Sequence, residues 1–597
     1  MRARFTEKKG KPVTRSQTRL KKRAAEAIED KKKEQKRSCK RVQFEIDSSE
    51  SFEPNEVSES FEISRSRDDE QNLLEGLQLT KDGKYVKLDE KLLNRLTPYE
   101  EEIPKQNPFE KYPCFENTLQ DGTGLTLDFL ENCSQIMKAD QDAMKMADIV
   151  GNLPLEWLSM KRSEMREDNW DYSVKFPINP KVTDQGQSGR CWLYAALSSL
   201  RVSLMRKFNV EHKFEFSESY LFFYDKIERS NMFLECMWSL RHRSRLDREV
   251  LLLSNSNSHV LQDGGSFYHF LNLVSKYGLV PKNVYSESFN SRSSDFLNDS
   301  LISVLNNMSL EIYRNEAHWT RKDFEEKKKE YMITVYDLVT RFLGEPLKPT
   351  DKFDWTYKTE SGDTEVMHNL TPEKFYKIVV PHNNENKVVI INDPRHPETY
   401  YMPSHNPYSL NIHGGLNSVM INVPMDIFKK AVYESLKNED LVWFASDVRK
   451  CFDSEHNTFD TKRFDYKSVL GTDIEFSKSD MLETMTSIPA HAMVFNGVDA
   501  VEDSEGNVSK YTKWRVENSW GMQDVLENDP DFGYFRMTDE YFDKYVYEAA
   551  VDIKYLDPDA LEKLGANVKN GKSYTYEPYD AFGAVARRAK CPQCSRK

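Results

Sequence analysis

The most constraining feature of this chain is a cysteine placed where a polar loop passes into an apolar helical stretch. The segment Asp184-Gln-Gly-Gln-Ser-Gly-Arg-Cys-Trp is small and polar up to Gly189, which suits a tight turn. Residues 192–204 then show apolar spacing that predicts a partly buried helix. A thiol in the first turn of a helix meets the positive end of the macrodipole and unpaired N–H groups, and both favour the thiolate. Cys191 is therefore a candidate nucleophile, although an isolated cysteine is more often a small core residue.

Two segments far downstream carry partners for such a nucleophile. Residues 490–498 predict a strand that carries His491 and ends at an Asn-Gly turn. After a polar turn at 502–507, residues 514–521 predict a second strand that presents Asn518 next to Trp520. A hairpin would set His491 beside Asn518. Thiolate, imidazole base and an amide that holds the imidazole tautomer are the three roles of a cysteine hydrolase, so the three segments together favour catalysis over a core histidine.

These motifs resemble one family. Gln-x-x-x-Gly-x-Cys-Trp, His-Ala-Met and Glu-Asn-Ser-Trp-Gly are similar to the papain-type cysteine peptidases, and the long Cys-to-His interval is typical of their bleomycin hydrolase and aminopeptidase C branch. The resemblance runs from about residue 118 to 586. It implies Cys191 as nucleophile, His491 as general base and acid, and Asn518 as orienter. It also implies the side chain of Gln185 and the backbone N–H of Cys191 as the oxyanion-hole donors.

The same resemblance implies an α+β, papain-like fold with a helical half and a β-barrel-like half. In such clefts a Gly-Gly dipeptide lines the non-primed wall, which assigns substrate binding to Gly264 and Gly265, and Trp520 supports the site. The pattern divides the chain into a basic, largely disordered arm (1–75), a linker or docking segment (76–117), a peptidase domain (118–578) with an insertion at about 291–467, and a C-terminal tail in or near the cleft (579–597). In the family the insertion builds assembly contacts, which implies a homohexamer.

Local patterns predict several elements of that domain. Helices are expected over residues 125–147, 324–343 and 425–437, and short strands at 379–380 and 388–391. The first helix carries Met137 and Met144, and such a methionine stripe is more often part of a core than a cofactor site.

Charge is distributed unevenly. The first 41 residues hold 17 Lys and Arg against 5 Asp and Glu, whereas the whole chain carries a net charge of −13. This asymmetry indicates a basic arm on an acidic body. The Lys/Arg clusters in residues 1–41 are typical of nuclear import or nucleic-acid contact, and an arm that is merely solvated fits equally well. No recognition fold accompanies the arm, so sequence-specific DNA binding is not supported.

Cysteine usage indicates the compartment. The eight cysteines form no regular framework, and Ser188 and Gln262 occupy the positions that secreted papain-like enzymes bridge. The amino terminus is charged, and no run approaches about 18 apolar residues, so we expect no membrane segment and a cytoplasmic protein, with nuclear entry left open. Cys591 and Cys594 form only half of a zinc site, and neither metal nor cofactor is expected.

The C-terminal tail bears on what is cleaved. In this branch the terminal carboxylate of the tail pairs with the substrate's α-ammonium. Residues 579–586 resemble that tail, but the chain continues beyond Ala586, the residue whose carboxylate would bind substrate. We therefore expect an intracellular cysteine aminopeptidase acting on short peptides with a free N-terminus, which trims its own tail near Ala586. The alternatives are an endopeptidase or zymogen blocked by the tail, and a catalytically silent scaffold with a nucleic-acid-binding arm.

Overall fold

The computed structural model describes residues 77–79, 85–87, 125–165, 169–254, 261–379, 386–474, 476–521 and 533–584. The chain divides into two units, Met1–Leu127 and Asp128–Lys597. In the first unit, β1 (Leu77–Leu79) pairs antiparallel with β2 (Tyr85–Lys87). The predicted basic arm, most of the linker, and the tail positions Ala586, Cys591 and Cys594 lie outside the described residues.

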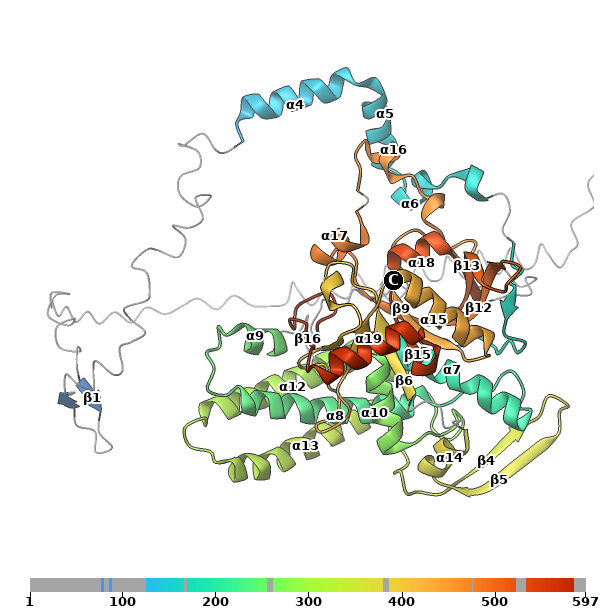
Figure 1. The fold of residues 1–597 in the computed structure, drawn as a ribbon. Coiled ribbons are helices and arrows are strands. Elements are labelled where there is room, and N and C mark those ends of the chain that lie inside the picture. Colours follow the sequence, from blue (N-terminus) through green and yellow to red (C-terminus); the bar gives the residue numbers. More distant parts are fainter. Residues whose placement is uncertain are drawn as a thin grey trace, which may run out of the picture. The chain divides into compact units, whose positions relative to one another are not determined.

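The second unit has a helical part that begins with α7 (Cys191–Phe208), the helix predicted after the polar loop. Because α7 carries apolar side chains on all of its faces, the helix is buried along most of its length. Three long helices, α8 (Glu218–Ser239), α12 (Asp295–Arg314) and α13 (Arg321–Leu343), lie side by side in this part (Figure 1). The shorter helices are α9 (Arg248–Ser254), α10 (Phe267–Tyr277), α11 (Phe289–Arg292) and α14 (Pro372–Val379).

The other part is a twelve-stranded sheet in the order β10-β11-β14-β13-β12-β9-β15-β6-β8-β7-β16, with β3 paired to β12. Its pairings are antiparallel except for β11–β14, β6–β8 and β7–β16. The strands are β3 (Val174–Lys175), β6 (Lys387–Ile391), β7 (Pro403–His405), β8 (Val419–Asn422), β9 (Val442–Ser446), β10 (Phe452–Asp453), β11 (Thr458–Phe459), β12 (His491–Glu502), β13 (Val508–Glu517), β14 (Tyr534–Thr538), β15 (Val546–Asp552) and β16 (Tyr574–Thr575).

Both faces of this sheet are covered. Along β9, Trp443 and Ala445 join the core shared with the helical part, whereas Phe444 between them joins a second core. That second core includes side chains of α15 (Met425–Lys437), the helix predicted after Pro424, and of α18 (Asp539–Tyr545). The α+β class predicted from the sequence is therefore confirmed.

The remaining elements are smaller or peripheral. They are α4 (Leu127–Ala139), α5 (Gln141–Val150), α6 (Leu155–Ser159), α16 (Tyr466–Leu470), α17 (Lys478–Glu483), α19 (Pro558–Lys569), the hairpin of β4 (Phe353–Lys358) with β5 (Thr364–Leu370), and the 3₁₀ turns η3 (Arg162–Met165), η5 (Pro397–Thr399), η6 (Thr461–Arg463) and η8 (Ile553–Tyr555).

One predicted turn is wrong. Strand β12 does not end at Asn496-Gly497 but runs through it to Glu502, and the pairing register with β13 shifts between Phe495 and Gly497. A Cβ at Gly497 would meet the Cβ of Arg515 at 3.1 Å and the carbonyl oxygen of Val174 at 3.1 Å. The glycine therefore serves a bulge between two closely approaching strands rather than a turn.

Two further local predictions are corrected. Val379 ends helix α14 instead of forming a strand, because Phe375 and Val379 bury the same face one turn apart. The predicted helix over 125–147 is divided into α4 and α5 at Asp140, whose side chain accepts the N–H groups of the next helix. Met137 and Met144 are 45% and 39% exposed, so they do not form a core. The spacing is helical, but neither helix has a buried residue.

Candidate active site

Cys191 lies at the very start of α7, where it was predicted, and is half-buried. The first N–H groups of a helix have no partner within the helix and carry the positive end of its dipole. The backbone N–H of Ala492, the second residue of β12, is directed at the sulfur with an N···Sγ distance of 3.4 Å. The Cys191 sulfur therefore lies among N–H dipoles that stabilise a thiolate.

His491 and Asn518 are brought together by the pairing of β12 with β13. His491 Nε2 lies 2.8 Å from Asn518 Oδ1. The same oxygen accepts the backbone N–H of Ser519 at 2.7 Å, which fits a carbonyl oxygen and not an amide nitrogen. Nε2 therefore carries the hydrogen, and Nδ1 is left as the basic nitrogen. The predicted hairpin placement of these two side chains is confirmed.

The imidazole is shielded from water. His491 is 2% exposed, and the ring of Trp520 lies 5.0 Å from it, centroid to centroid, at an interplanar angle of 32°. Burial disfavours the charged ring and lowers the pKa of His491 to about 4, although the hydrogen bond to Asn518 acts in the opposite direction. At neutral pH the ring is therefore uncharged and able to accept a proton.

Gln185 ties the cysteine loop to the segment that follows β13. Its backbone N–H donates to the carbonyl of Ser519 at 2.9 Å, and its Oε1 accepts the Ser519 hydroxyl at 2.6 Å. Its Nε2 donates one hydrogen to the carbonyl of Ser188 at 2.5 Å. An amide nitrogen carries a second hydrogen, and this is the group that the sequence predicts as an oxyanion donor.

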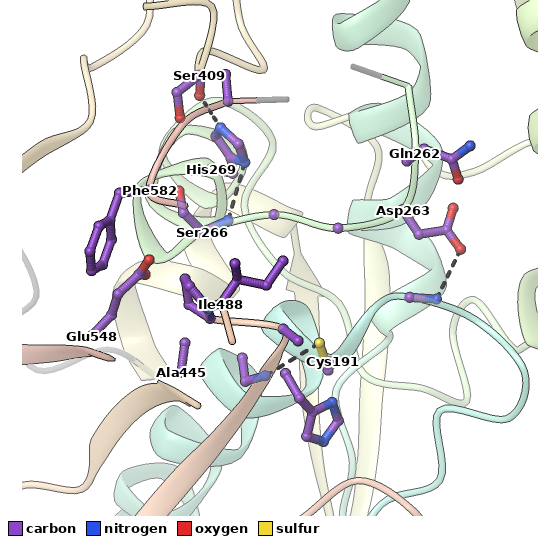
Figure 2. Close-up of a pocket in the computed structure, with 18 of the residues that line it drawn as sticks. Cys191, Gln262, Asp263, Ser266, His269, Ser409, Ala445, Ile488, Glu548 and Phe582 are labelled. Atoms are coloured by element: carbon purple, nitrogen blue, oxygen red, sulfur yellow. Dashed lines mark hydrogen bonds between the residues drawn. The ribbon is translucent and has the colours of Figure 1, made fainter. Parts of the chain in front are cut away.

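The predicted residues meet at one cavity of about 990 Å³. Gln185, Cys191, Gly264, Gly265 and His491 all line it, whereas Asn518 and Trp520 do not. Figure 2 shows Cys191 on one side of this cavity and Glu548 and Phe582 on the other. A cavity of this size accommodates a short peptide.

Gly265 is constrained by packing as well as by its place in the cavity wall. A Cβ there would lie 2.4 Å from Cε2 of Trp192, the residue directly after Cys191. The Trp192 indole is fixed, because its Nε1 donates to the carbonyl of Asp263 at 2.7 Å. The wall and the start of α7 thus approach so closely that only glycine fits.

The described part of the C-terminal tail forms one wall of the same cavity. Residues 581–584 line it together with Cys191. The tail is held upstream by Asp580, which accepts two hydrogen bonds from the Arg395 guanidinium at 2.9 and 3.0 Å. It is also held by Asn406, whose Nδ2 donates to the carbonyl of Phe582 at 2.6 Å. Ala586 itself lies beyond the described residues.

Sequence reasoning missed two sets of supporting residues. One is the Arg395–Asp580 pair on the tail, and the other is the pair formed by Arg190 and Glu287 beneath the cysteine loop. The signal in the sequence was Arg190 itself, a charged residue that directly precedes Cys191 at the start of a predicted apolar helix.

No group of three or more His, Cys, Asp or Glu side chains in the described part of the chain is arranged to hold a metal ion. Four cysteines within the described ranges, Cys133, Cys191, Cys236 and Cys451, are free thiols. Over the same ranges, no helix combines the length and apolar character needed to cross a bilayer.

A family model described as the Peptidase C1-like family matches residues 124–583. Aminopeptidase C of Lactobacillus delbrueckii subsp. lactis is 34% identical, over 71% of this chain and 91% of its own length. Bleomycin hydrolase of Homo sapiens is 33% identical, over 72% of this chain and 91% of its own. The crystal structure of PepW from Lactobacillus rhamnosis HN001 is similar with a TM-score of 0.71 and 30% identity, covering 78% of this chain and 100% of that one. The papain-like fold predicted from the sequence is confirmed.

Proposed function

The chain belongs to the Peptidase C1-like family, and we propose that it is a cysteine aminopeptidase that removes N-terminal residues from short peptides. The observation that carries this proposal is the meeting of Cys191, His491 and the chain's own tail in one cavity. The similarity to proteins named aminopeptidase C and bleomycin hydrolase supports it over most of the chain.

In the proposed reaction, the Cys191 sulfur attacks the carbonyl carbon of the first peptide bond while its proton passes to Nδ1 of His491. The carbonyl oxygen becomes an oxyanion, which accepts hydrogen bonds from the Gln185 side chain and the Cys191 backbone N–H. One such preorganised donor is worth roughly 2.7–4 kcal/mol of the barrier. The imidazolium then protonates the leaving amine, which leaves a thioester. Water, deprotonated by His491, hydrolyses the thioester and restores the thiol.

The tail supports the exopeptidase part of the proposal. Because residues 581–584 form part of the cavity wall, a substrate chain that extends past Cys191 on that side would meet them. The proposal includes self-trimming near Ala586, which would leave a carboxylate for the substrate's α-ammonium, with Gly264 and Gly265 as the wall that binds the substrate backbone. The second candidate is an endopeptidase or zymogen, favoured if the untrimmed tail blocks the same cavity.

Other parts of the proposal rest on the sequence alone. They are a homohexameric assembly, an intracellular location with nuclear entry open, and a basic arm (1–41) that is either solvated or contacts nucleic acid. If Cys191, His491 and Asn518 were catalytically inactive, the third candidate would be a scaffold that binds nucleic acid through the basic arm.

The test compares aminoacyl fluorogenic substrates with and without an N-acetyl block, on wild type and on Cys191→Ser. Wild-type cleavage that prefers the free amine and disappears in Cys191→Ser is the expected result. Equal cleavage of the blocked substrate would favour the endopeptidase. No cleavage of either substrate by wild type would overturn the proposal and leave the scaffold.

A further inference from the structure

We propose that Arg190, the residue before Cys191, is a positioning residue that fixes the oxyanion loop (184–190) and the first turn of α7 against the segment 285–294. The Arg190–Glu287 pair would then govern turnover and not substrate affinity. This inference rests on the proposed role of Cys191 as nucleophile.

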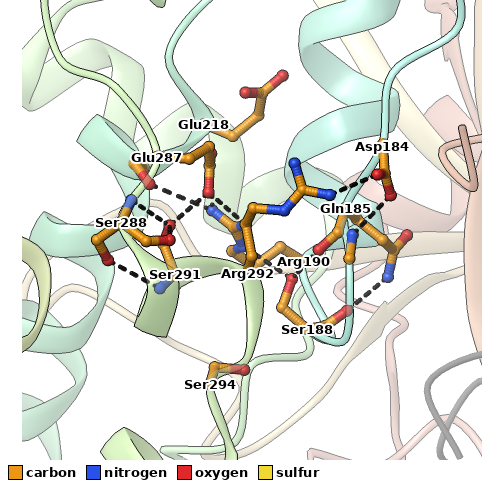
Figure 3. A network of polar contacts seen from close by, with 12 residues as sticks. Asp184, Gln185, Ser188, Arg190, Glu218, Glu287, Ser288, Ser291, Arg292 and Ser294 are labelled. Carbon is orange, nitrogen blue, oxygen red and sulfur yellow. Dashed lines mark hydrogen bonds and ion pairs between the residues drawn. The ribbon is translucent and has the colours of Figure 1, made fainter. Parts of the chain in front are cut away.

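The Arg190 side chain is an unusual feature of the site because its guanidinium is completely buried. It donates to both oxygens of Glu287, at 2.8 and 3.2 Å, and to the hydroxyl of Tyr194 at 3.3 Å. The Nε of Arg190 donates to the Ser188 hydroxyl at 2.9 Å. One rigid group thus joins the loop, helix α7 and the segment 285–294. Figure 3 shows its contacts with Ser188 and Glu287.

The network continues from Arg190 to the proposed oxyanion donor. The Ser188 hydroxyl that accepts from Arg190 donates in turn to the backbone carbonyl of Gln185 at 2.7 Å. The Ser188 carbonyl accepts from Nε2 of Gln185. A shift of the guanidinium is therefore passed through one residue to the group that would face the oxyanion.

Glu287 is itself held in place. Its Oε2 accepts the hydroxyl of Ser291 at 2.5 Å. Burial opposes its charge, but Arg190 outweighs burial and the pKa of Glu287 is lowered to about 2. The pair is therefore ionised at any pH at which the enzyme would work.

The segment 285–294 also contacts the oxyanion loop at a second place, through Arg292. Arg292 donates to Asp184 at 2.5 Å, and its carbonyl accepts the N–H of Gln187 at 2.7 Å. Gly186 between them has a φ of +61°, and a Cβ there would lie 2.7 Å from the Arg292 carbonyl oxygen. The loop is thus fitted against the segment 285–294 at both of its ends.

A lysine cannot replace this arrangement. Guanidinium offers five N–H donors in a planar fork, whereas an ammonium group is a single point with three donors on a flexible stem. A misplacement of about 1 Å at a reacting centre can cost about 100-fold in rate. Stability is a different matter, because a buried ion pair replaced by apolar side chains often leaves a protein equally stable.

The experiment uses three variants of the full chain: Arg190→Lys, the apolar double variant Arg190→Met/Glu287→Leu, and the control Arg463→Lys. The control removes a second fully buried guanidinium, which pairs with Asp453 at 2.5 Å and does not line the cavity. For Arg190→Lys and the double variant we expect kcat to fall between about 10- and 100-fold with KM within about twofold. For the control we expect a lower melting temperature and an unchanged kcat.

Recovery of wild-type kcat in a stable double variant would mean that the pair is only structural, and would overturn the inference. If the double variant does not fold, Arg190→Lys decides: wild-type kcat in that variant overturns the inference, and reduced kcat with the fold retained supports it.

Alkylation separates this inference from the proposed function, because it needs no peptide substrate. The rate at which iodoacetamide modifies Cys191 is followed by mass spectrometry. A several-fold slower rate in Arg190→Lys than in wild type and the control supports positioning, even if wild type cleaves no peptide and the proposed function fails. Equal alkylation rates in wild type, Arg190→Lys and Arg463→Lys, together with equal kcat, would overturn the inference.

Discussion

At the scale of single residues, burial disfavours the charged form of the His491 imidazole and lowers its pKa. The carbonyl oxygen of Asn518 fixes the hydrogen on Nε2 of His491, so Nδ1 is the nitrogen that can take a proton. Both the hydrogen bond and the burial are consequences of the β12–β13 hairpin that carries the two residues.

Burial of His491 predicts a pH dependence of stability in a Cys191→Ala background, where no thiolate opposes it. The folded pKa of about 4 lies below the unfolded value of about 6.5, so the unfolded chain binds the proton more tightly. The contribution is complete above about pH 6.5 and is lost as the pH falls toward 4, by about 3 kcal/mol. Urea unfolding between pH 4 and 7.5, compared with Cys191→Ala/His491→Gln, measures it. Parallel curves for the two proteins would contradict the prediction.

Gly265 gives a second prediction at this scale. In Gly265→Ala the new methyl group would overlap the Trp192 ring, so we expect a loss of roughly 1–3 kcal/mol in the free energy of unfolding and a raised KM. Gly565→Ala in α19 is the matched control, because nothing lies within 4 Å of a Cβ there. Gly565→Ala should leave KM unchanged and raise the free energy of unfolding by up to about 1 kcal/mol. Thermal or urea unfolding measures the stability of both variants, and peptidase assays measure their KM. Wild-type stability and KM in Gly265→Ala would contradict the prediction.

At the scale of elements, the position of the tail depends on an ion pair between two parts of the chain. Arg395 follows β6 and Asp580 follows β16, and their two hydrogen bonds hold residues 581–584 at the cavity. Arg395 is also bound by Asp393, which fixes the guanidinium before it meets the tail.

Removing the charge from Asp580 should therefore loosen the tail without disturbing the candidate residues Cys191, His491 and Asn518. For Asp580→Asn we expect cleavage of N-acetylated substrates to rise relative to free aminoacyl substrates by at least about tenfold, the equivalent of about 1.4 kcal/mol. Asp337→Asn, which breaks an exposed pair with Arg341, is the control and should not change the ratio. If both variants keep the wild-type ratio, the Arg395–Asp580 pair does not control how the tail limits substrate binding.

At the scale of the whole molecule, the proposed self-trimming has a direct readout. Because residues 581–584 line the cavity together with Cys191, wild type should lose the residues after Ala586, whereas Cys191→Ala should retain them. Intact-mass spectrometry of both purified proteins measures the difference. A tail retained in wild type, or lost equally from both proteins, would refute trimming by the enzyme itself.

The sequence by itself determined the elements whose pattern is local. Helices α7, α13 and α15, strand β6 and the hairpin of β12 with β13 follow from periodicity, caps and polar turns within a few residues of one another. The candidate residues Gln185, Cys191, His491 and Asn518 were found for the same reason, because each stands in a short motif.

Tertiary structure decided what depends on neighbours distant in the chain. Helical spacing at Met137 does not say whether another element covers that face, and the Asn-Gly of β12 looks like a turn until β13 and β3 are seen on either side. The Arg190–Glu287 and Arg395–Asp580 pairs join residues 97 and 185 positions apart. A local pattern records which side chains are charged, but only the folded chain decides which opposite charges are buried against each other, because that pairing is set by distance in space.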